Sequence, residues 1–150
     1  MIKRSSQPQW FFSKSEKKAI VEAIQLAEKQ TSGEIRVHLE RKARENFMEH
    51  AESVFQKIGM TKTEKRNGVL IFIGIKSRRF AILGDQGIHA VVPQNFWDEI
   101  TASMLLEFKE DRFADGVLKA IEKTAEKLKT YFPYEKEDRN EIKDCISYSW

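Results

Sequence analysis

The feature that most constrains the fold of this chain is an almost wholly apolar run over residues 69–75, which a short polar turn separates from a second apolar run over residues 80–83. Val, Ile and Phe dominate the first run, and these residues favour strands. A strand that is buried on both faces carries apolar side chains at successive positions. The sequence therefore predicts two antiparallel strands joined by a turn at residues 76–79, with the first strand in the core of a sheet.

Upstream of this hairpin, the pattern predicts a helix followed by a strand. Ser13, with Glu16 three residues later, forms a capping-box pattern, and apolar residues then recur at helical spacing as far as Gln30. Residues 34–40 alternate between polar and apolar side chains. This alternation is typical of a strand that is covered on one face only.

A second amphipathic helix, which ends at Gly59, joins that strand to the hairpin. A strand, helix, strand connection of this length places its two strands parallel to each other. The strand that begins at Arg79 must then return antiparallel. Two more helices with an apolar face follow, one after Pro93 and one that Pro133 closes.

The element order is thus α-β-α-β-β-α-α, and the predicted fold is a three-layer α/β/α sandwich with a small mixed sheet. Residues 13–133 form its single domain, since 150 residues suit one domain. Residues 1–12 are expected to be a leader that ends in an apolar plug at Trp10, and residues 134–150 a charged tail. Within that tail, residues 145–148 could add a short edge strand.

Charge and composition exclude several classes of protein. The 26 basic and 23 acidic residues are mixed along the chain, which argues against a nucleic-acid partner. No apolar run approaches the roughly 20 residues that a membrane helix needs, and no signal peptide is visible. Cys145 is the only cysteine, so a disulfide within the chain and a thiolate-rich zinc site are both excluded. We expect a soluble, cytoplasmic monomer that needs no cofactor.

Three oxygen-bearing side chains are expected at one end of the sheet. Because the strand from Arg79 runs antiparallel, its end at Asp85 returns to the edge where Glu34 and Asn67 begin the other two strands. Carboxylate and amide oxygens are the ligands that Ca²⁺ and Mg²⁺ prefer. A divalent-cation site formed by Asp85, Asn67 and Glu34 is one interpretation. The other is that Asp85 and Asn67 are turn residues that form local hydrogen bonds.

Basic residues are expected at the opposite end of the sheet. The turn that holds Arg78 and Arg79 should lie near Arg41, and arginine pairs bind phosphate or carboxylate groups through two-point contacts. These residues form a candidate patch for an anion or a protein partner. A solvated turn, whose charges prevent pairing at the sheet edge, is the alternative.

The strand that begins at Asn67-Gly68-Val69-Leu70, the turn Ser77-Arg78-Arg79 and the loop from Gly84 to Pro93 resemble the TPM-domain family. That family includes thylakoid-lumen proteins linked to photosystem II repair and many bacterial proteins. The resemblance implies an α/β/α sandwich, and it implies the acid phosphatase activity and divalent-cation binding proposed for family members. The chain departs from the family at Arg66, His89 and Gln94, where acidic residues are common.

Each of these departures removes negative charge from the implied cation site. A metal-assisted phosphohydrolase needs several convergent acidic ligands. The favoured function is therefore a non-catalytic binding or accessory module with weak divalent-cation binding and a protein partner of unknown identity. A weak metal-assisted acid phosphatase, with Asp85 as its main carboxylate, is the alternative.

Overall fold

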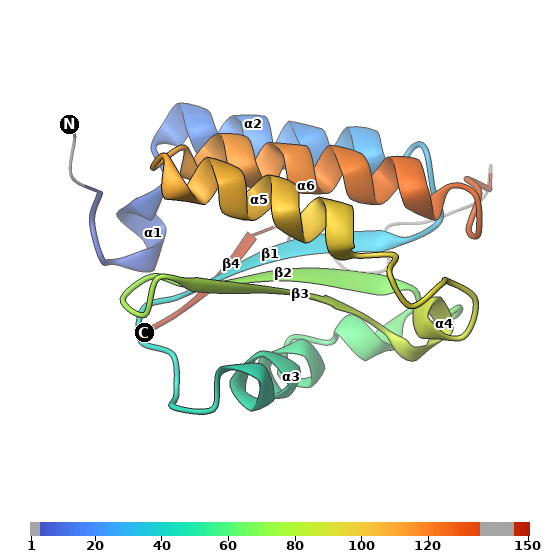
Figure 1. The fold of residues 1–150 in the computed structure, drawn as a ribbon, viewed down its shortest axis with the longest axis horizontal. Coiled ribbons are helices and arrows are strands. Elements are labelled where there is room, and N and C mark those ends of the chain that lie inside the picture. The colour runs from blue at the N-terminus through green and yellow to red at the C-terminus, as the bar shows by residue number, and fades with distance from the viewer. Residues whose placement is uncertain (1–3, 136–145) are drawn as a thin grey trace.

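The computed structural model describes residues 4–135 and 146–150, and its elements form the predicted three-layer sandwich. In Figure 1, α2, α5 and α6 lie on one face of the sheet and α3 lies on the other. Residues 1–3 of the predicted leader and 136–145 of the predicted tail, with Cys145, lie outside the described residues. The elements are α1 (Pro8–Phe11), α2 (Lys14–Ala27), β1 (Glu34–Glu40), α3 (Phe47–Lys57), η1 (Met60–Lys62), β2 (Gly68–Gly74), β3 (Arg79–Gly84), α4 (Gln86–His89), α5 (Asp98–Lys109), α6 (Phe113–Leu128) and β4 (Ile146–Ser149).

The sheet has the strand order β3-β2-β1-β4. β1 and β2 are parallel, with Glu34 opposite Gly68, and β2 and β3 are antiparallel, as predicted. β4 pairs parallel with β1 from Val37 opposite Ile146 onward. The edge strand that the sequence left open is therefore present, and residues 146–149 belong to the sheet.

Local signals set the ends of the first two long helices. Ser13 Oγ accepts a hydrogen bond from Glu16 N at 3.1 Å, and Glu16 Oε1 accepts one from Ser13 N at 2.9 Å, which is the predicted capping box. α2 then ends at Ala27 rather than at Gln30. Gly59 follows α3 with a φ of 84°, a left-handed conformation that glycine adopts without strain.

The core has one layer on each face of the sheet, and β2 contributes to both. Val69, Ile71 and Ile73 pack with the helices α2, α5 and α6, while Leu70 and Phe72 pack with α3. This explains why β2 carries apolar side chains at successive positions. In the predicted leader, Phe11 and Phe12 are also buried in the larger cluster.

The prediction that β1 is covered on one face only was wrong, because all seven of its residues are buried. Ile35, Val37 and Leu39 face the larger core, as predicted. Glu34, Arg36, His38 and Glu40 alternate with them and are buried as well. They lose contact with water because α3 lies across that face of the sheet and β4 covers the edge of β1.

The segment between β3 and α5 also differs from the pattern. The third predicted helix was expected directly after Pro93, but α5 begins at Asp98. A short helix, α4, precedes it and begins directly after Asp85. In the part of the chain that the structure describes, no helix has the length and apolar character needed to cross a membrane.

Candidate functional site

The three residues of the predicted cation site lie around Gly68, at one end of the sheet. Glu34 is paired with Gly68 across the parallel ladder, and Asn67 precedes it in the chain. The backbone N–H of Asp85 donates a hydrogen bond to Gly68 O at 3.0 Å. The topology therefore brings Asp85, Asn67 and Glu34 to the same end of the sheet, as predicted.

Both carboxylate oxygens of Asp85 already have partners. Arg66 Nε lies 2.6 Å from Asp85 Oδ2, and one Arg66 Nη lies 3.0 Å from Asp85 Oδ1. Asp85 Oδ1 also accepts a hydrogen bond from the Gln86 N–H at 2.8 Å, which caps the first turn of α4. The neighbouring carboxylate raises the pKa of Arg66 above its ordinary value.

Arg66 reaches Asp85 from a loop held in an uncommon conformation. Its φ is 51°, in the left-handed region that residues other than glycine rarely adopt. The loop is fixed from both sides, because Arg66 N donates to Thr63 O and Arg66 O accepts from Gly87 N at 2.9 Å. Arg66 thus occupies a position from which its charge neutralises Asp85.

The other two predicted ligands are also engaged. Asn67 donates through its side-chain amide to Ser32 Oγ at 3.2 Å. Glu34 lies beside Glu28, the residue that caps the end of α2, and the two carboxyl groups share a hydrogen bond. Burial, followed by this contact with Glu34, raises the pKa of Glu28 to about 8.

These contacts do not fit a strong divalent-cation site. A cation at Asp85 would have to displace the Arg66 guanidinium, and the nearby Glu34 shares a proton with Glu28. Within residues 4–135 and 146–150, no three His, Cys, Asp or Glu side chains are grouped so that they could hold a metal ion. The contacts of Asp85 are those of a capping and turn residue, the alternative that the sequence left open.

Glu28 is the residue of this end of the sheet that sequence reasoning missed. It stands at the C-terminus of α2, where the helix dipole disfavours a negative charge. An acidic residue at that position was a local inconsistency in the sequence. A proton on Glu28 resolves it, because the neutral carboxyl group does not oppose the dipole.

The opposite end of the sheet carries the predicted basic residues. Lys76 N donates a hydrogen bond to Arg41 O at 3.1 Å, so the hairpin turn lies against the end of β1. Arg78 and Arg79 are exposed in that turn, and the Arg79 guanidinium lies 4.6 Å from the ring centre of Phe47. We call the set Arg41, Lys42, Arg44, Lys76, Arg78 and Arg79 the basic end. Among the described residues, none of these six side chains forms an ion pair.

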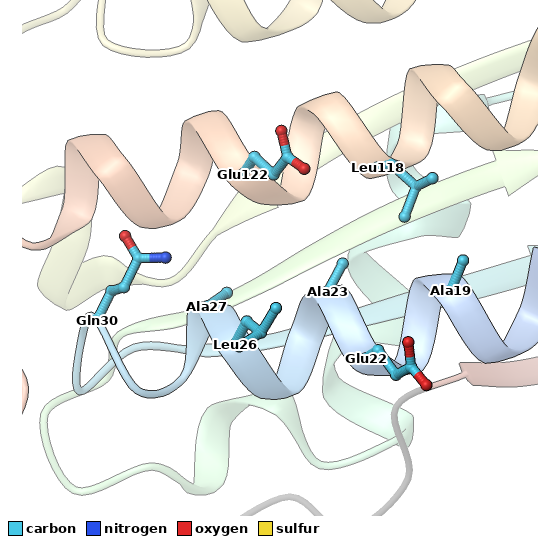
Figure 2. Close-up of a pocket in the computed structure, with 8 residues that line it drawn as sticks. All are labelled: Ala19, Glu22, Ala23, Leu26, Ala27, Gln30, Leu118 and Glu122. Atoms are coloured by element: carbon cyan, nitrogen blue, oxygen red, sulfur yellow. The ribbon is translucent and has the colours of Figure 1, made fainter.

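A shallow groove of about 420 Å³ lies on the outer helical layer, between α2 and α6. Figure 2 shows Ala19 and Ala23 of α2 and Leu118 of α6 pointing toward one another across it. Its lining includes the carboxylates of Glu22 and Glu122 and no basic side chain. The groove is therefore a poor place for an anion, in contrast to the basic end.

Comparisons with known proteins agree on the family. The family model described as the TPM domain matches residues 6–127. The NMR structure of the BA42 protein from the psychrophilic bacterium Bizionia argentinensis is 41% identical, with a TM-score of 0.90 over 97% of this chain and 100% of that chain. The solution NMR structure of the N-terminal domain of a protein from P. gingivalis has a TM-score of 0.59 at 14% identity, covers 84% of this chain and 82% of that one, and shows the fold alone. No curated protein matches. The chain belongs to the TPM domain family.

Proposed function

We propose that this TPM domain is a non-catalytic binding module that takes an acidic protein segment at the basic end of its sheet. One observation carries the proposal: the hydrogen bond from Lys76 N to Arg41 O joins two basic segments that are 35 residues apart in the sequence (76 minus 41). We further propose that the domain acts as a cytoplasmic monomer.

The position of the basic end supports binding. β1, β2 and β4 are parallel, so their carboxyl ends meet at this edge. Ligands of open sheets with parallel strands bind outside these carboxyl ends. The turn also presents an exposed Arg78, whose φ is 54° and whose backbone N–H donates a hydrogen bond to Ile75 O at 3.3 Å.

The chemistry of the basic end favours a carboxylate-rich partner. Arginine binds carboxylate groups through two parallel N–H donors. The Arg79 guanidinium lies over the ring of Phe47, and a guanidinium in this arrangement can still donate such bonds from its edge. The loop 41–45 and the turn 76–79 together hold the six basic residues and one acidic residue, Glu45. Their net charge is therefore positive.

We propose only weak binding of Ca²⁺ or Mg²⁺ at Asp85, Asn67 and Glu34. Arg66 opposes a cation there through charge repulsion, and the buried Asp85 is the main carboxylate that could offset cation dehydration. The dissociation constant is expected on the order of 10⁻³ M, the range of charge-poor calcium sites. A weak acid phosphatase activity through the same carboxylate is the alternative function.

Binding is tested with a 12-residue peptide of alternating Glu and Gly, titrated into the ¹⁵N-labelled domain at low salt. Amide shifts are expected in residues 41–45 and 76–79, and 0.5 M NaCl should remove them, because salt screens exposed charges. The variant with Arg78→Ala and Arg79→Ala lowers the net charge by two, as Lys29→Glu does, and should bind at least tenfold more weakly. Lys29→Glu, at the opposite end of the sheet, is the control for net charge.

The outcomes separate the two functions. Loss of binding in the double variant, with binding retained in Lys29→Glu, supports the binding module. Equal weakening in both variants would mean that the peptide responds only to net charge, and the proposal would fail. Hydrolysis of p-nitrophenyl phosphate that requires Mg²⁺ or Ca²⁺ and disappears in Asp85→Ala would favour the phosphatase.

A further inference from the structure

A chain of polar contacts beneath the sheet connects α3, β1 and the C-terminal strand β4. The ring of His38 is in contact with both serines of β4: Nδ1 lies 2.7 Å from Ser147 Oγ and Nε2 lies 2.9 Å from Ser149 Oγ. His38 Nε2 also lies 3.2 Å from Glu40 Oε1. The same Glu40 oxygen lies 3.4 Å from Nε2 of His50 in α3.

The partners of the two rings define where their protons are. The backbone N–H of Arg44 donates to His50 Nδ1 at 2.9 Å, so this nitrogen is the acceptor. Nε2 is then the nitrogen of His50 that lies beside Glu40 Oε1, at 3.4 Å. His38 donates to the same carboxylate through Nε2, and its Nδ1 therefore accepts from the Ser147 hydroxyl. The contacts of His38 are thus those of the Nε2–H tautomer.

A second proton on His38 would change these contacts. With a proton on Nδ1, the Ser147 hydroxyl would have to turn and accept a hydrogen bond instead of donating one.

The His38 side chain is almost completely shielded from solvent, with 1% of its surface exposed. Phe72 of β2 stacks on the ring at 5.6 Å, and β4 contributes uncharged serines. The charged groups that face it are Arg36 and Glu40 on β1, with His50 on α3. Burial is the main cause that lowers the pKa of His38, and Glu40 acts in the opposite direction.

We infer that protonation of His38 controls the pairing of the C-terminal strand β4 with β1. The neutral ring holds β4 through Ser147 and Ser149, and uptake of a proton favours release of β4 from β1. The reason is linkage. In the open state, water reaches His38 and the ring takes a proton at its ordinary pKa, whereas the closed state resists the proton. Acidification therefore shifts the equilibrium toward the open state.

Release of β4 changes what the sheet can bind. Arg41 N donates to Ser149 O at 2.9 Å, and β4 pairs with β1 from Val37 to Glu40. Without β4, these backbone groups of β1 form an open edge that accepts another strand. The contacts between β4 and β1 lie beside Arg41, so proton uptake by His38 would change the sheet next to the basic end. The contacts of His38 with Ser147 and Ser149 are not used by the proposed function.

The test is amide hydrogen exchange by NMR at pH 7.5 and 5.5, corrected for the intrinsic pH dependence of exchange. Amides of residues 146–149 and the amide of Arg41 report the opening of β4. For a histidine with an ordinary pKa near 6.5 in the open state and no proton in the closed state, the opening constant should rise about tenfold. Amides of β2 should show no such selective rise.

Three variants make the result specific. His38→Gln removes the titrating ring, so the opening constant should not change with pH. His89→Gln replaces the exposed histidine of α4 and should retain the tenfold rise. The variant with Ser147→Ala and Ser149→Ala keeps His38 but removes its partners on β4, so β4 should open more often at both pH values.

Some results would overturn the inference. These are an opening constant of the wild type that does not depend on pH, or a rise that persists in His38→Gln. Unchanged opening in the serine variant would also overturn it, and that variant keeps the test valid if His38→Gln does not fold. None of these readouts depends on peptide binding at the basic end, so the two proposals can fail separately.

Discussion

Glu28 and Glu34 meet across the turn between α2 and β1 and share one hydrogen bond, and the pKa of Glu28 is raised to about 8. A buried pair of carboxyl groups cannot easily hold two negative charges, so the fold retains a proton that the unfolded chain releases near pH 4.5. The contribution of Glu28 to stability is therefore complete below pH 4.5. It is lost as the pH rises from 4.5 to 8.

The first prediction concerns this proton. In Glu28→Gln, the amide can donate to Glu34 and its oxygen can accept from Ile35 N, as Glu28 does at 3.1 Å. Urea unfolding between pH 5 and 9 should show that wild type loses stability relative to the variant as the pH rises, with a slope of at most about 1.4 kcal/mol per pH unit. Glu22→Gln, at an exposed position of the same helix, should follow the wild type. Parallel curves for wild type and Glu28→Gln would contradict the prediction.

The second prediction concerns Glu107 in α5, whose carboxylate receives Arg112 Nε at 2.6 Å and Lys119 Nζ at 2.8 Å. Arg112 first, and then Lys119, lowers the pKa of Glu107 to about 2. The folded pKa is depressed, so this stabilisation is present above pH 4.5 and is lost as the pH falls toward 2. A ¹³C titration of the Glu107 carboxyl group should give a midpoint near 2. Arg112→Met should raise that midpoint more than Lys119→Met does, and the reverse order would contradict the assignment of the larger effect to Arg112.

The third prediction tests the close approach of α4 to the loop before β2. A Cβ atom on Gly87 would lie 2.1 Å from Lys65 O and 2.6 Å from Arg66 O, which are both backbone atoms. Gly87→Ala must therefore move α4 away from Arg66, and the Arg66–Asp85 ion pair should weaken with it. Thermal unfolding should show a lower midpoint, and the Arg66 side-chain Nε–H signal should shift. Gln86→Ala, at the exposed neighbouring position, serves as the control and should change neither.

Sequence reasoning succeeded where a side chain's environment is set by its neighbours in the chain. The run from Val69 to Ile73 predicted a doubly covered strand because both faces of β2 are apolar. The capping box at Ser13 and the stop at Gly59 depend on contacts within a few residues. The resulting order of elements was sufficient for the parallel and antiparallel pairings and for the three layers.

Sequence reasoning failed where elements that are distant in the chain determine the environment of a side chain. The alternation of His38 with apolar neighbours is the usual pattern of a half-exposed strand. The cover over His38 comes from Phe72 of β2 and from Ser147, which is 109 residues away. Similarly, Arg66 was interpreted as a lost acidic ligand, and only the fold shows that it is the ion-pair partner of Asp85, 19 residues further along the chain.

The fourth prediction concerns weak cation binding at Asp85. Titration of the labelled domain with Ca²⁺ should give shifts in residues 33–35, 66–68 and 84–89, with a dissociation constant on the order of 10⁻³ M. Arg66→Gln removes the competing guanidinium and should increase the affinity, while Asp85→Asn should abolish the shifts. Asn is also a good N-cap residue, so Asp85→Asn keeps α4 capped, whereas Asp85→Ala should cost about 1 kcal/mol of stability in addition. Submicromolar binding, or binding that Asp85→Asn leaves unchanged, would exclude this site.

The last prediction concerns the contribution of β4 to the stability of the whole domain. Ile146 and Tyr148 pack against the larger core cluster, while Ser147 and Ser149 alternate with them and face His38. Deletion of residues 146–150 removes two partly buried apolar side chains and uncovers the polar row of β1. Because a buried apolar side chain contributes roughly 1.5–3 kcal/mol, the deletion should lower the free energy of unfolding by about 2–4 kcal/mol. Urea unfolding at pH 7.5 measures this loss. A deletion variant with wild-type stability would mean that residues 146–150 are a dispensable tail after all, and the charged-tail interpretation of the sequence would then be the correct one.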